Sequence, residues 1–406
     1  MSGKIRKVPE GARLTDYVSL GVIGKYLPIG KIKDAVDRCG KTDRRRRDLP
    51  AHLMVYFVVA MALFMGSSYR EILRCLFEGL QWIKGPKEPV KIVGKSRISQ
   101  ARKRLGPGPL KMLCEETVAP IAVPATRGAW YRSSRLVSMD GSTVDVADTP
   151  ENEARFGRPG SSRGDSAFPQ LRMVSLVENG THVLFGTRFG PYSTGEGTLA
   201  EGVVESLSPG FLCLADRGFY GFDLWEKARR TGADLLWRMK KNAVLPCEKR
   251  LFDGSYLSHV YPSPADRKKR RNGVPVRVVE YRLNGIPGSE KLYRLITTIL
   301  DPEKAPADEL AAVYHERWEI ETAIGELKTH LKGARLVLRS KTPDLVEQEF
   351  YGFLLAHFAI RSLMHEAALE NEMDPDGLSF IHAVRVVRRK LPMFVAFPPS
   401  GGGNAF

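Results

Sequence analysis

The sequence lacks an apolar run long enough to cross a membrane, and its opening residues lack the apolar core of a secretory signal. The longest apolar stretch, LMVYFVVAMALFM at residues 53–65, is far shorter than the ~20 residues that a membrane-spanning helix needs. We expect it to form a buried helix. The first residues, MSGKIRKVPEGARL, are mostly polar and basic. These absences predict a cytoplasmic protein without a membrane partner.

Cysteine is also scarce, and its spacing shows no pattern. The cysteines are odd in number and widely scattered: Cys39, Cys75, Cys114, Cys213 and Cys247. This excludes a disulfide framework and a zinc knot, because both need cysteines at paired spacings. We expect free thiols in a reducing compartment.

Acidic residues are too few to balance the basic ones. Lys and Arg number 62 and Asp and Glu 46, so the formal net charge is +16. A hydrophobic content of 43% and a charged content of 27% are typical of a folded protein and exclude a disordered chain. At 406 residues, two or three domains are expected. The excess positive charge favours a polyanionic partner, nucleic acid first and an anionic membrane surface second.

The first third of the chain, residues 14–128, has a helical pattern. Pro50 marks the start of one helix, and Ser67 or Ser68 is the expected N-cap of the next. The segment KSRISQARKRLGPGPLKMLCEETV combines two helical stretches around a Gly-Pro-Gly turn, and basic residues are concentrated before the turn at Lys95, Arg97, Arg102, Lys103 and Arg104. Two short helices around a turn are typical of a DNA-docking unit. We expect DNA contact here and at the run KTDRRRRDLP (41–50), with a solvated basic linker as the alternative.

The middle of the chain alternates between apolar strands and helices. The expected elements are strands at 135–139, 171–177, 182–189, 211–215 and 233–239, helices at 194–207 and 223–231, and a long polar loop at 145–170. Asp140 follows the first of these strands and Asp216 the fourth, each with a glycine nearby. Such a carboxylate is held rigidly while it stays open to a metal. Alternatively, Asp140 caps a turn and Asp216 pairs with Arg217 or Arg229.

A helix-like stretch further on, Ala311–His330, carries polar residues at a regular spacing. Tyr314, Arg317, Glu321 and Lys328 stand at offsets 0, +3, +7 and +14. At ~100° per residue, these offsets place the four side chains within roughly 60° of one helix face. A carboxylate flanked by a hydroxyl and two cations suits a site that holds metal and phosphate together. The alternative is a solvated helix face with ordinary ion pairs.

Together these residues form the pattern of a known family. The spacing Tyr-x2-Arg-x3-Glu-x6-Lys from Tyr314 to Lys328, with Asp140 in MDGS and Asp216 in LADRGFYG, resembles that of the DDE transposases of the insertion-sequence-4 family. The stretches at 49–76 and 357–389 resemble the helical N-terminal domain and the C-terminal tail of those transposases. The resemblance therefore covers nearly the whole chain.

The resemblance implies a fold, an activity and a set of site residues. The fold would be α/β, a ribonuclease-H-like mixed-sheet catalytic core with a β-rich insertion, preceded by a helical N-terminal domain. The activity would be cutting and joining of phosphodiesters at insertion-sequence ends by two-metal-ion catalysis, as cut-and-paste with a hairpin intermediate. Asp140, Asp216 and Glu321 would be the catalytic acids and ligands of Mg²⁺, for which Mn²⁺ would substitute. DNA phosphates would be held by Tyr314, Arg317 and Lys328.

The resemblance also implies partners and a domain order. The partners would be double-stranded DNA, as terminal inverted repeats and as target, and a second copy of the chain on paired ends, at the nucleoid. The expected domains are a helical DNA-binding domain at 1–128, the first part of the core at 129–240, the β-rich insertion at 241–303, the Glu321 helix with the C-terminal helices at 304–392, and a flexible tail at 393–406. Within the insertion, 275–283 and 291–300 predict a hairpin. Two alternatives are a metal-dependent nuclease without strand transfer and a DNA-binding protein without chemistry.

Overall fold

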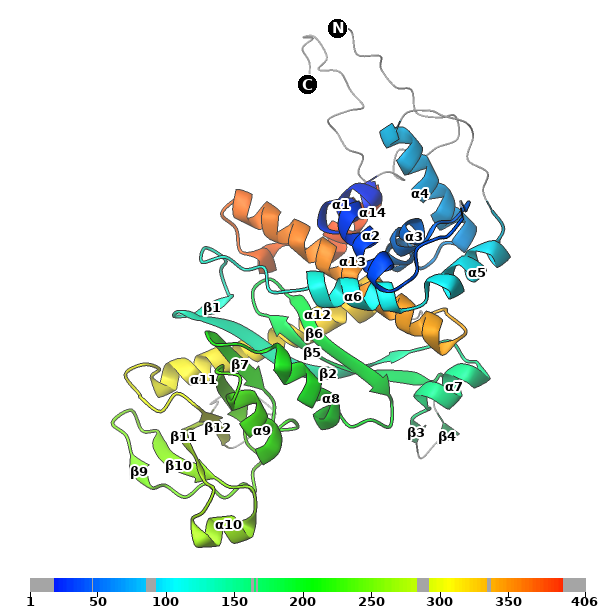
Figure 1. Ribbon diagram of the computed structural model, residues 1–406. Coiled ribbons are helices and arrows are strands. Elements are labelled where there is room, and N and C mark those ends of the chain that lie inside the picture. Colours follow the sequence, from blue (N-terminus) through cyan, green and yellow to red (C-terminus); the bar gives the residue numbers. More distant parts are fainter. Residues whose placement is uncertain are drawn as a thin grey trace, which may run out of the picture.

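The computed structural model describes residues 18–45, 47–84, 93–161, 164–165, 167–282, 292–333 and 337–389. A helical part lies above a mixed sheet, and a smaller β-rich part continues the sheet at its other end (Figure 1). No helix within these described ranges has both the length and the apolar character needed to cross a membrane. All five cysteines are free thiols, as predicted.

The first third of the described chain is helical, as predicted. Its helices are α1 (Val18–Tyr26), α2 (Ile29–Arg38), α3 (Ala51–Leu63), α4 (Tyr69–Lys84), α5 (Lys95–Leu105) and α6 (Gly108–Thr117). Pro50 precedes α3, and the Ser68 hydroxyl caps α4 by accepting a 3.2 Å hydrogen bond from the Glu71 N–H. Gly106 ends α5 with a φ of 67°, a conformation that glycine adopts without strain. The two predicted helices around this turn are therefore present.

The N-terminal helices share one hydrophobic core with the C-terminal helices α13 (Pro343–Glu370) and α14 (Phe380–Arg389). This core joins side chains such as Val58 of α3, Leu110 of α6 and Phe353 of α13 to Val144 of the sheet. Figure 1 shows α13 running between the N-terminal helices and the sheet. The helical part is therefore packed on the rest of the protein and not separated from it by a linker.

Arg102, one of the five basic residues expected around the α5–α6 turn, is a buried anchor with 1% exposure. Its guanidinium donates hydrogen bonds to Gln348 Oε1 (2.8 Å), Tyr69 OH (2.9 Å), Ser340 Oγ (3.0 Å) and the Leu345 carbonyl (3.1 Å). Arg102 therefore ties α5 to the start of α13 and does not face solvent.

One mixed sheet of ten strands forms the centre of the molecule. Nine of its strands follow the order β6-β5-β2-β7-β8-β12-β11-β10-β9, and β1 (Trp130–Tyr131) pairs with β2. Their bounds are β2 Ser134–Asp145, β5 Gln170–Glu178, β6 Val183–Pro191, β7 Phe211–Ala215, β8 Asp234–Arg238, β9 Lys249–Arg250, β10 Tyr256–Val260, β11 Val274–Tyr281 and β12 Tyr293–Thr297. The pairs β2–β7 and β7–β8 are parallel, and the other pairs are antiparallel. This arrangement confirms the predicted α/β class with a ribonuclease-H-like mixed sheet and a β-rich insertion.

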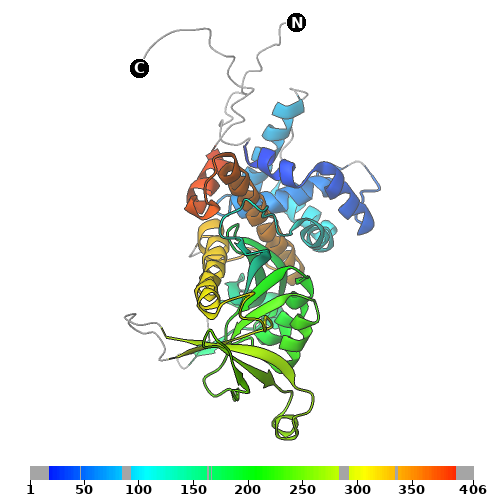
Figure 2. The ribbon, with the colours of Figure 1, turned by 90° about the vertical axis from the view of Figure 1, so that its left-hand side faces the viewer.

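The two faces of the sheet carry different helices. On one face, α8 (Glu196–Val203) and α9 (Phe222–Arg229) cover the side chains of Val137, Met139 and Ala215. On the other face lie α11 (Ala307–His315) and α12 (Glu319–Gly325), which Figure 2 shows opposite α8 and α9. Because side chains alternate along a strand, the even-numbered residues of β2 and β7 point toward α11 and α12.

Two expectations for the central region were wrong. Asp140 does not end its strand, because β2 continues to Asp145. The expected loop at 145–170 contains helix α7 (Pro150–Phe156), in which the Thr149 hydroxyl caps the Asn152 N–H at 3.3 Å. The same region holds a small ribbon of β3 (Gly160–Ser161) and β4 (Gly164–Asp165).

The predicted insertion hairpin is present as the antiparallel pair β11–β12, and its expected turn at 285–288 lies outside the described residues. Helix α10 (Pro264–Lys269) lies on the neighbouring connection.

Candidate active site

Asp140 and Asp216 occupy neighbouring positions on adjacent parallel strands. The pairing between β2 and β7 runs to Met139 opposite Ala215; Asp140 is the next residue of β2, and Asp216 directly follows the end of β7. Neighbouring strands lie ~4.8 Å apart, so the register brings the two carboxylates to the same edge of this pair. Both point to the face covered by α11 and α12, because Leu136 and Leu214 of the same parity pack there.

Each aspartate has one oxygen held by the backbone. Asp140 Oδ1 accepts a 2.7 Å hydrogen bond from the Gly141 N–H, and Asp216 Oδ1 accepts one of the same length from the Gly218 N–H. At Gly218, a Cβ atom would lie 3.0 Å from Asp216 Oδ1, so the glycine allows this close approach. The neighbouring glycines therefore orient the carboxylates.

Glu321 approaches from a helical segment that is not one regular α-helix. The stretch predicted at 311–330 consists of α11, a 3₁₀ turn at Glu316–Trp318, α12, and a π-helical turn at Glu326–Leu331. Such departures from α-helical winding are frequent at functional sites. The constant angle of ~100° per residue, on which the predicted stripe rested, therefore does not hold along the whole segment.

Arg317 lies between the acid on the sheet and the acid on the helix. Its Nη1 lies 3.7 Å from Asp140 Oδ2, and its Nη2 lies 3.5 Å from Glu321 Oε1. The Arg317 side chain is only 9% exposed, whereas that of Glu321 is 48% exposed. The guanidinium also lies 4.8 Å from the ring centre of Trp318. The structure thus brings Arg317 and Glu321 together with Asp140.

The charge on Asp140 is only partly compensated. Burial, together with the negative charges of Asp216 and Glu321, raises the pKa of Asp140 to about 6, although the Gly141 N–H and Arg317 oppose the shift. Charges that affect a pKa lie close to the group they act on, so all three acids belong to one neighbourhood. An acid of this kind is stabilised by an added cation.

Tyr314 and Lys328 reach the same strands from either side of Arg317. The Tyr314 hydroxyl is buried and donates a 3.3 Å hydrogen bond to the Ala215 carbonyl, and burial raises its pKa. Lys328 Nζ donates a 2.8 Å hydrogen bond to Ser142 Oγ on β2, and burial lowers its pKa. The four residues of the predicted stripe therefore all point toward the β2–β7 edge.

One cation at this edge, Arg238, was not predicted from the sequence. Trp237 of β8 pairs with Ala215 of β7, so Arg238 occupies the position beside Asp216. Its guanidinium lies 4.5 Å from the ring centre of Tyr293. The charge of Arg238 opposes the rise that burial causes in the pKa of Tyr314. The sequence feature that could have indicated it is an arginine at the end of a third parallel strand, in WRMKK (237–241). Trp237 itself is buried against Trp225 in the core, whereas Trp318 is 57% exposed.

The donor set of the three acids suits a hard cation. All the ligand atoms on Asp140, Asp216 and Glu321 are carboxylate oxygens, which Mg²⁺ prefers. Among the described residues, the ligand atoms of the three acids do not all lie within 4.8 Å of one another. His182, Glu319 and Asp376 meet that distance. The cationic group between Asp140 and Glu321 is that of Arg317, so Arg317 must move for an ion to touch both.

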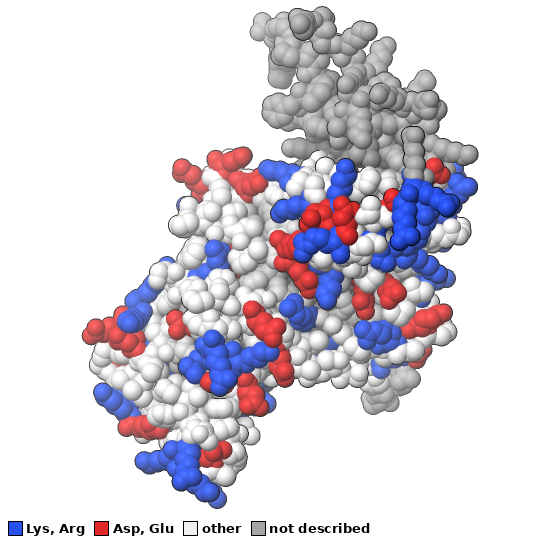
Figure 3. Space-filling model, viewed as in Figure 1, with Lys and Arg blue, Asp and Glu red and all other residues white. Residues whose placement is uncertain are grey.

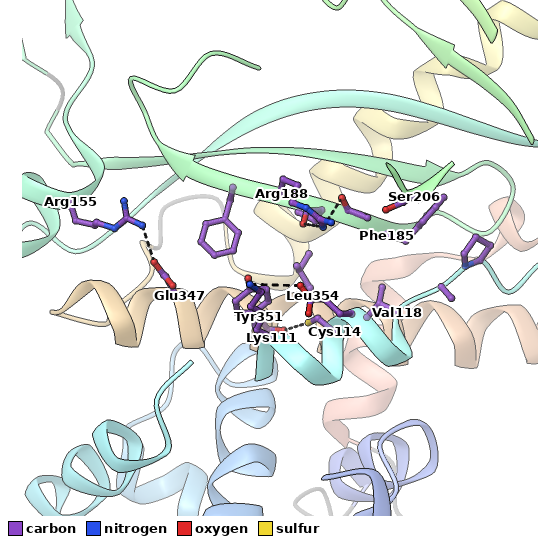
Figure 4. A pocket seen from close by; sticks show the side chains of 16 residues that line it. Lys111, Cys114, Val118, Arg155, Phe185, Arg188, Ser206, Glu347, Tyr351 and Leu354 are labelled. Atoms are coloured by element: carbon purple, nitrogen blue, oxygen red, sulfur yellow. Dashed lines mark hydrogen bonds and ion pairs between the residues drawn. The ribbon is translucent and has the colours of Figure 1, made fainter. Parts of the chain in front are cut away.

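A cavity of about 780 Å³ lies elsewhere, between α6, α13 and β6 (Figure 4). Lys111, Tyr351 and Phe185 are among its lining residues, and none of the predicted site residues lines it. Arg155 and Glu347 in its wall form a 3.4 Å ion pair. The cavity is therefore separate from the acids.

Exposed basic side chains gather at several places away from the acids, among them α5, α9 and the end of α10. Figure 3 shows Lys and Arg over α5 and around α10. The exposed members at these two places are Lys95, Arg97, Lys103 and Arg104 on α5, and Lys268 and Lys269 on α10 with Arg270 and Arg271 after it. The positive potential at α5 and at the end of α10 attracts DNA phosphates.

Comparisons with known proteins place the chain among transposases. The family described as "Insertion element 4 transposase N-terminal" matches residues 17–115, and the family described as "Transposase DDE domain" matches residues 131–359. "Transposase InsG for insertion sequence element IS4" of Escherichia coli strain K12 is 32% identical over 375 residues, which are 91% of this chain and 82% of that protein. "Putative transposase InsZ" of the same strain is 24% identical over 220 residues, 54% of this chain and 71% of its own.

A solved structure also aligns with the chain. It is titled "Cryo-EM structure of piggyBac transposase synaptic complex with hairpin DNA (SNHP)", and the alignment covers 96% of this chain and 87% of that one, with a TM-score of 0.47 and 11% identity.

Proposed function

The chain belongs to the insertion-sequence-4 family of DDE transposases, and we propose that Asp140, Asp216 and Glu321 are the ligands of two Mg²⁺ ions with which it cuts and joins DNA. It is a DNA-cleaving and DNA-joining enzyme that depends on a divalent metal. The observation that carries the proposal is the position of Asp140 and Asp216 directly after the last paired residues of β2 and β7, with Glu321 linked to Asp140 through Arg317. Mn²⁺ should substitute for Mg²⁺, because it accepts the same oxygen ligands.

The protein's own groups orient the catalytic carboxylates and keep them ionised. When bound, the ions would supply the Lewis acidity that polarises the phosphate and lowers the pKa of an attacking water. The Gly141 and Gly218 N–H groups keep the two aspartates in one orientation. Asp140 must be ionised to serve as a ligand, and Arg317 favours that form. The sheet thus presents two fixed acids, and the helical segment brings the third.

The cations beside the acids suit phosphate binding. Arg317 can form two parallel hydrogen bonds to a phosphate, and Lys328 can act as a point charge. Tyr314 is the third proposed phosphate contact, although its hydroxyl is held by the Ala215 carbonyl here. For each of the three, binding DNA would replace a contact inside the protein with one to the nucleic acid.

The course of the reaction follows from the family. We propose cut-and-paste transposition with a hairpin intermediate, carried out by a homodimer on paired ends at the nucleoid. The terminal inverted repeats would be read by the helical domain at 1–128, and the core would divide at residues 129–240 and 304–392 around the insertion at 241–303. The exposed basic residues of α5 and around α10 support DNA contacts by the N-terminal domain and by the insertion.

A cleavage assay with one conservative substitution tests this proposal. Wild-type protein with Mg²⁺ should cut DNA that carries the element's ends, whereas Glu321→Gln should lower the rate at least ~1,000-fold, because a metal ligand contributes several kcal/mol to transition-state stabilisation. A gel shift should show that the variant still binds the same DNA. Undiminished cleavage by Glu321→Gln would remove this glutamate from the site.

A strand-transfer assay separates joining from cutting. A labelled end fragment should become linked to a target plasmid when the wild-type protein acts on it. Cleavage without any linked product would favour a nuclease, and binding without cleavage in any divalent ion would favour a DNA-binding protein that has lost its chemistry.

A further inference from the structure

A second group of metal-ligating side chains lies apart from the predicted catalytic acids. His182 lies in the turn between β5 and β6, Glu319 begins α12, and Asp376 lies in the 3₁₀ turn Pro375–Gly377 before α14. One ligand atom from each lies within 4.8 Å of the other two. Glu319 precedes Glu321 by two residues, and roughly 200° of helix rotation separates their side chains. The two sites therefore use opposite faces of the same segment.

The imidazole of His182 points a buried nitrogen into this group. His182 is 4% exposed, and its Nε2 has no hydrogen-bond partner among the residues that the structure describes. Nε2 lies 3.1 Å from Asp376 Oδ1 and 3.7 Å from Glu319 Oε2, and neither contact is a hydrogen bond. With metal–ligand bonds of ~2.1 Å, neighbouring ligand atoms lie roughly 3.0–3.5 Å apart. The distance from Nε2 to Asp376 falls in this range, and the distance to Glu319 Oε2, which also accepts a hydrogen bond from the Gly180 N–H, would shorten slightly around an ion.

The other ring nitrogen of His182 faces a carboxylate. Glu326 Oε1 lies 3.4 Å from Nδ1, and Glu326 is held in place by Arg361, whose Nε donates to Oε2 at 2.8 Å. Metal-binding histidines commonly donate this second N–H to a carboxylate, which leaves a lone pair on the first nitrogen. In this structure Arg361 Nη2 donates to His182 Nδ1 and to Glu326 Oε1. Metal binding through Nε2 would place the proton on Nδ1, which would then donate to Glu326 and leave Arg361 Nη2 with Glu326 alone.

The charges around the group leave room for a dication. Glu319, Asp376 and Glu326 are acidic, Glu316 and Asp374 add negative charge beside Glu319 and Asp376, and Arg361 contributes one positive charge. Negative charge therefore exceeds positive charge around the group, which favours a bound cation. Asp376 is exposed enough to admit an ion and its waters.

We propose that His182, Glu319 and Asp376 bind a first-row transition-metal dication, with Zn²⁺ the best fit and waters completing its coordination. Imidazole nitrogen selects such ions over Mg²⁺, which prefers oxygen alone. The bound ion would tie the β5–β6 turn and the turn before α14 to the start of the helix that carries Glu321. His182, Glu319 and Asp376 are therefore positioning residues, which hold that helix against the sheet.

Zinc binding to the full-length protein tests this site. Metal-stripped protein is titrated with Zn²⁺ by calorimetry in about 10 mM Mg²⁺, which occupies oxygen-only sites. One Zn²⁺ should bind per chain and raise the Tm by about 4 °C at a hundredfold excess over Kd. Asp376→Asn should weaken binding roughly 100-fold or more, as should His182→Asn, in which asparagine tolerates the φ of 56° found at this position. The matched control, Asp140→Asn, should bind Zn²⁺ as the wild type does.

A stability comparison without metal separates an ion site from a plain hydrogen-bond network. Metal-free Asp376→Asn should be at least as stable as the metal-free wild type, because the substitution removes repulsion from Glu319. In Mn²⁺-loaded Asp140→Asn, electron spin echo should show coupling to a ¹⁴N nucleus, which the three predicted catalytic acids cannot supply. Absence of zinc binding, or zinc binding unchanged in both Asp376→Asn and His182→Asn, overturns the proposal. Zinc binding lost only in Asp140→Asn also overturns it, while leaving the proposed transposase chemistry intact.

Discussion

Two clusters of charged residues along the same helical segment differ in how their charges are met. In the closed cluster, Glu326 is buried and contacts His182, His357 and Arg361. In the open cluster, the guanidinium of Arg317 lies between Asp140 and Glu321, Asp216 lies nearby, and Glu321 is half exposed. In the closed cluster, the Glu326 carboxylate has partners on several sides. In the open cluster, part of the negative charge is not compensated.

The two clusters also shift carboxylate pKa values in opposite directions. Burial alone would raise the pKa of Glu326, but hydrogen bonds from His182 and His357 and the charge of Arg361 hold it well below its usual range. At Asp140 burial wins, and the pKa rises to about 6. A carboxylate whose charge is met inside the protein stabilises the fold. A buried carboxylate whose charge is not compensated lowers the stability of the fold, and such carboxylates are typical of ligand-binding sites.

The largest expected effect is on stability, at the closed cluster. Glu326→Gln leaves the charge of Arg361 buried without its partner, and we expect it to lower the free energy of unfolding by about 3–5 kcal/mol. Chemical denaturation followed by circular dichroism measures this change. The control Glu321→Gln should lie within about 0.5 kcal/mol of the wild type, because Glu321 is half exposed. Equal losses in both variants would contradict the contrast between the clusters.

A smaller effect is expected from removing the cation of the open cluster. Arg317→Ala should lower the rate of DNA cleavage roughly 100-fold, because a charged donor near the reacting phosphate is lost. Single-turnover cleavage of end-bearing DNA measures the rate. Lys328→Ala should lower it less, because lysine provides a point charge without the paired geometry of arginine. A larger loss for Lys328→Ala than for Arg317→Ala would reverse the roles assigned to them.

The smallest effect expected is the response of the open cluster to magnesium. At about ten times its Kd, Mg²⁺ should stabilise the wild type by about 1.4 kcal/mol, because it binds only the folded state. Thermal unfolding with and without Mg²⁺ measures this gain. Asp140→Asn should lose the gain and be no less stable than the wild type without Mg²⁺, since it removes a poorly compensated buried charge. A full magnesium response in Asp140→Asn would exclude Asp140 as a ligand.

Local sequence patterns predicted the strands better than their ends. The strand at 211–215 was predicted to the residue, because it is uniformly apolar and bounded by turn residues. The end of β2 was not predicted, because Asp140 lies where the partner β7 stops and not where β2 stops. β2 continues past Asp140 because it stays paired with β5 up to Asp145 opposite Gln170.

Contacts between distant segments explain the other differences. Arg102 reads as a surface cation, and its burial depends on Gln348 and Ser340, which lie far away in the chain. Helix α7 could have been recognised, because Thr149-Pro150-Glu151 is a typical helix start. The residue types and their places on strands and helix suggested the three acids as a metal-binding set, and the family resemblance assigned their catalytic role, since no local spacing brings Glu321 to the two aspartates.

The position of α13 limits how the protein can be divided. This helix packs against the N-terminal helices and against the sheet, within one hydrophobic core. A fragment that began at residue 129 would expose the apolar side of α13 to water and would be expected to aggregate. Exchanging the N-terminal helices between relatives would likewise require matching the surface of α13, so a new end-recognition specificity is more readily obtained by changing exposed side chains than by grafting a whole domain.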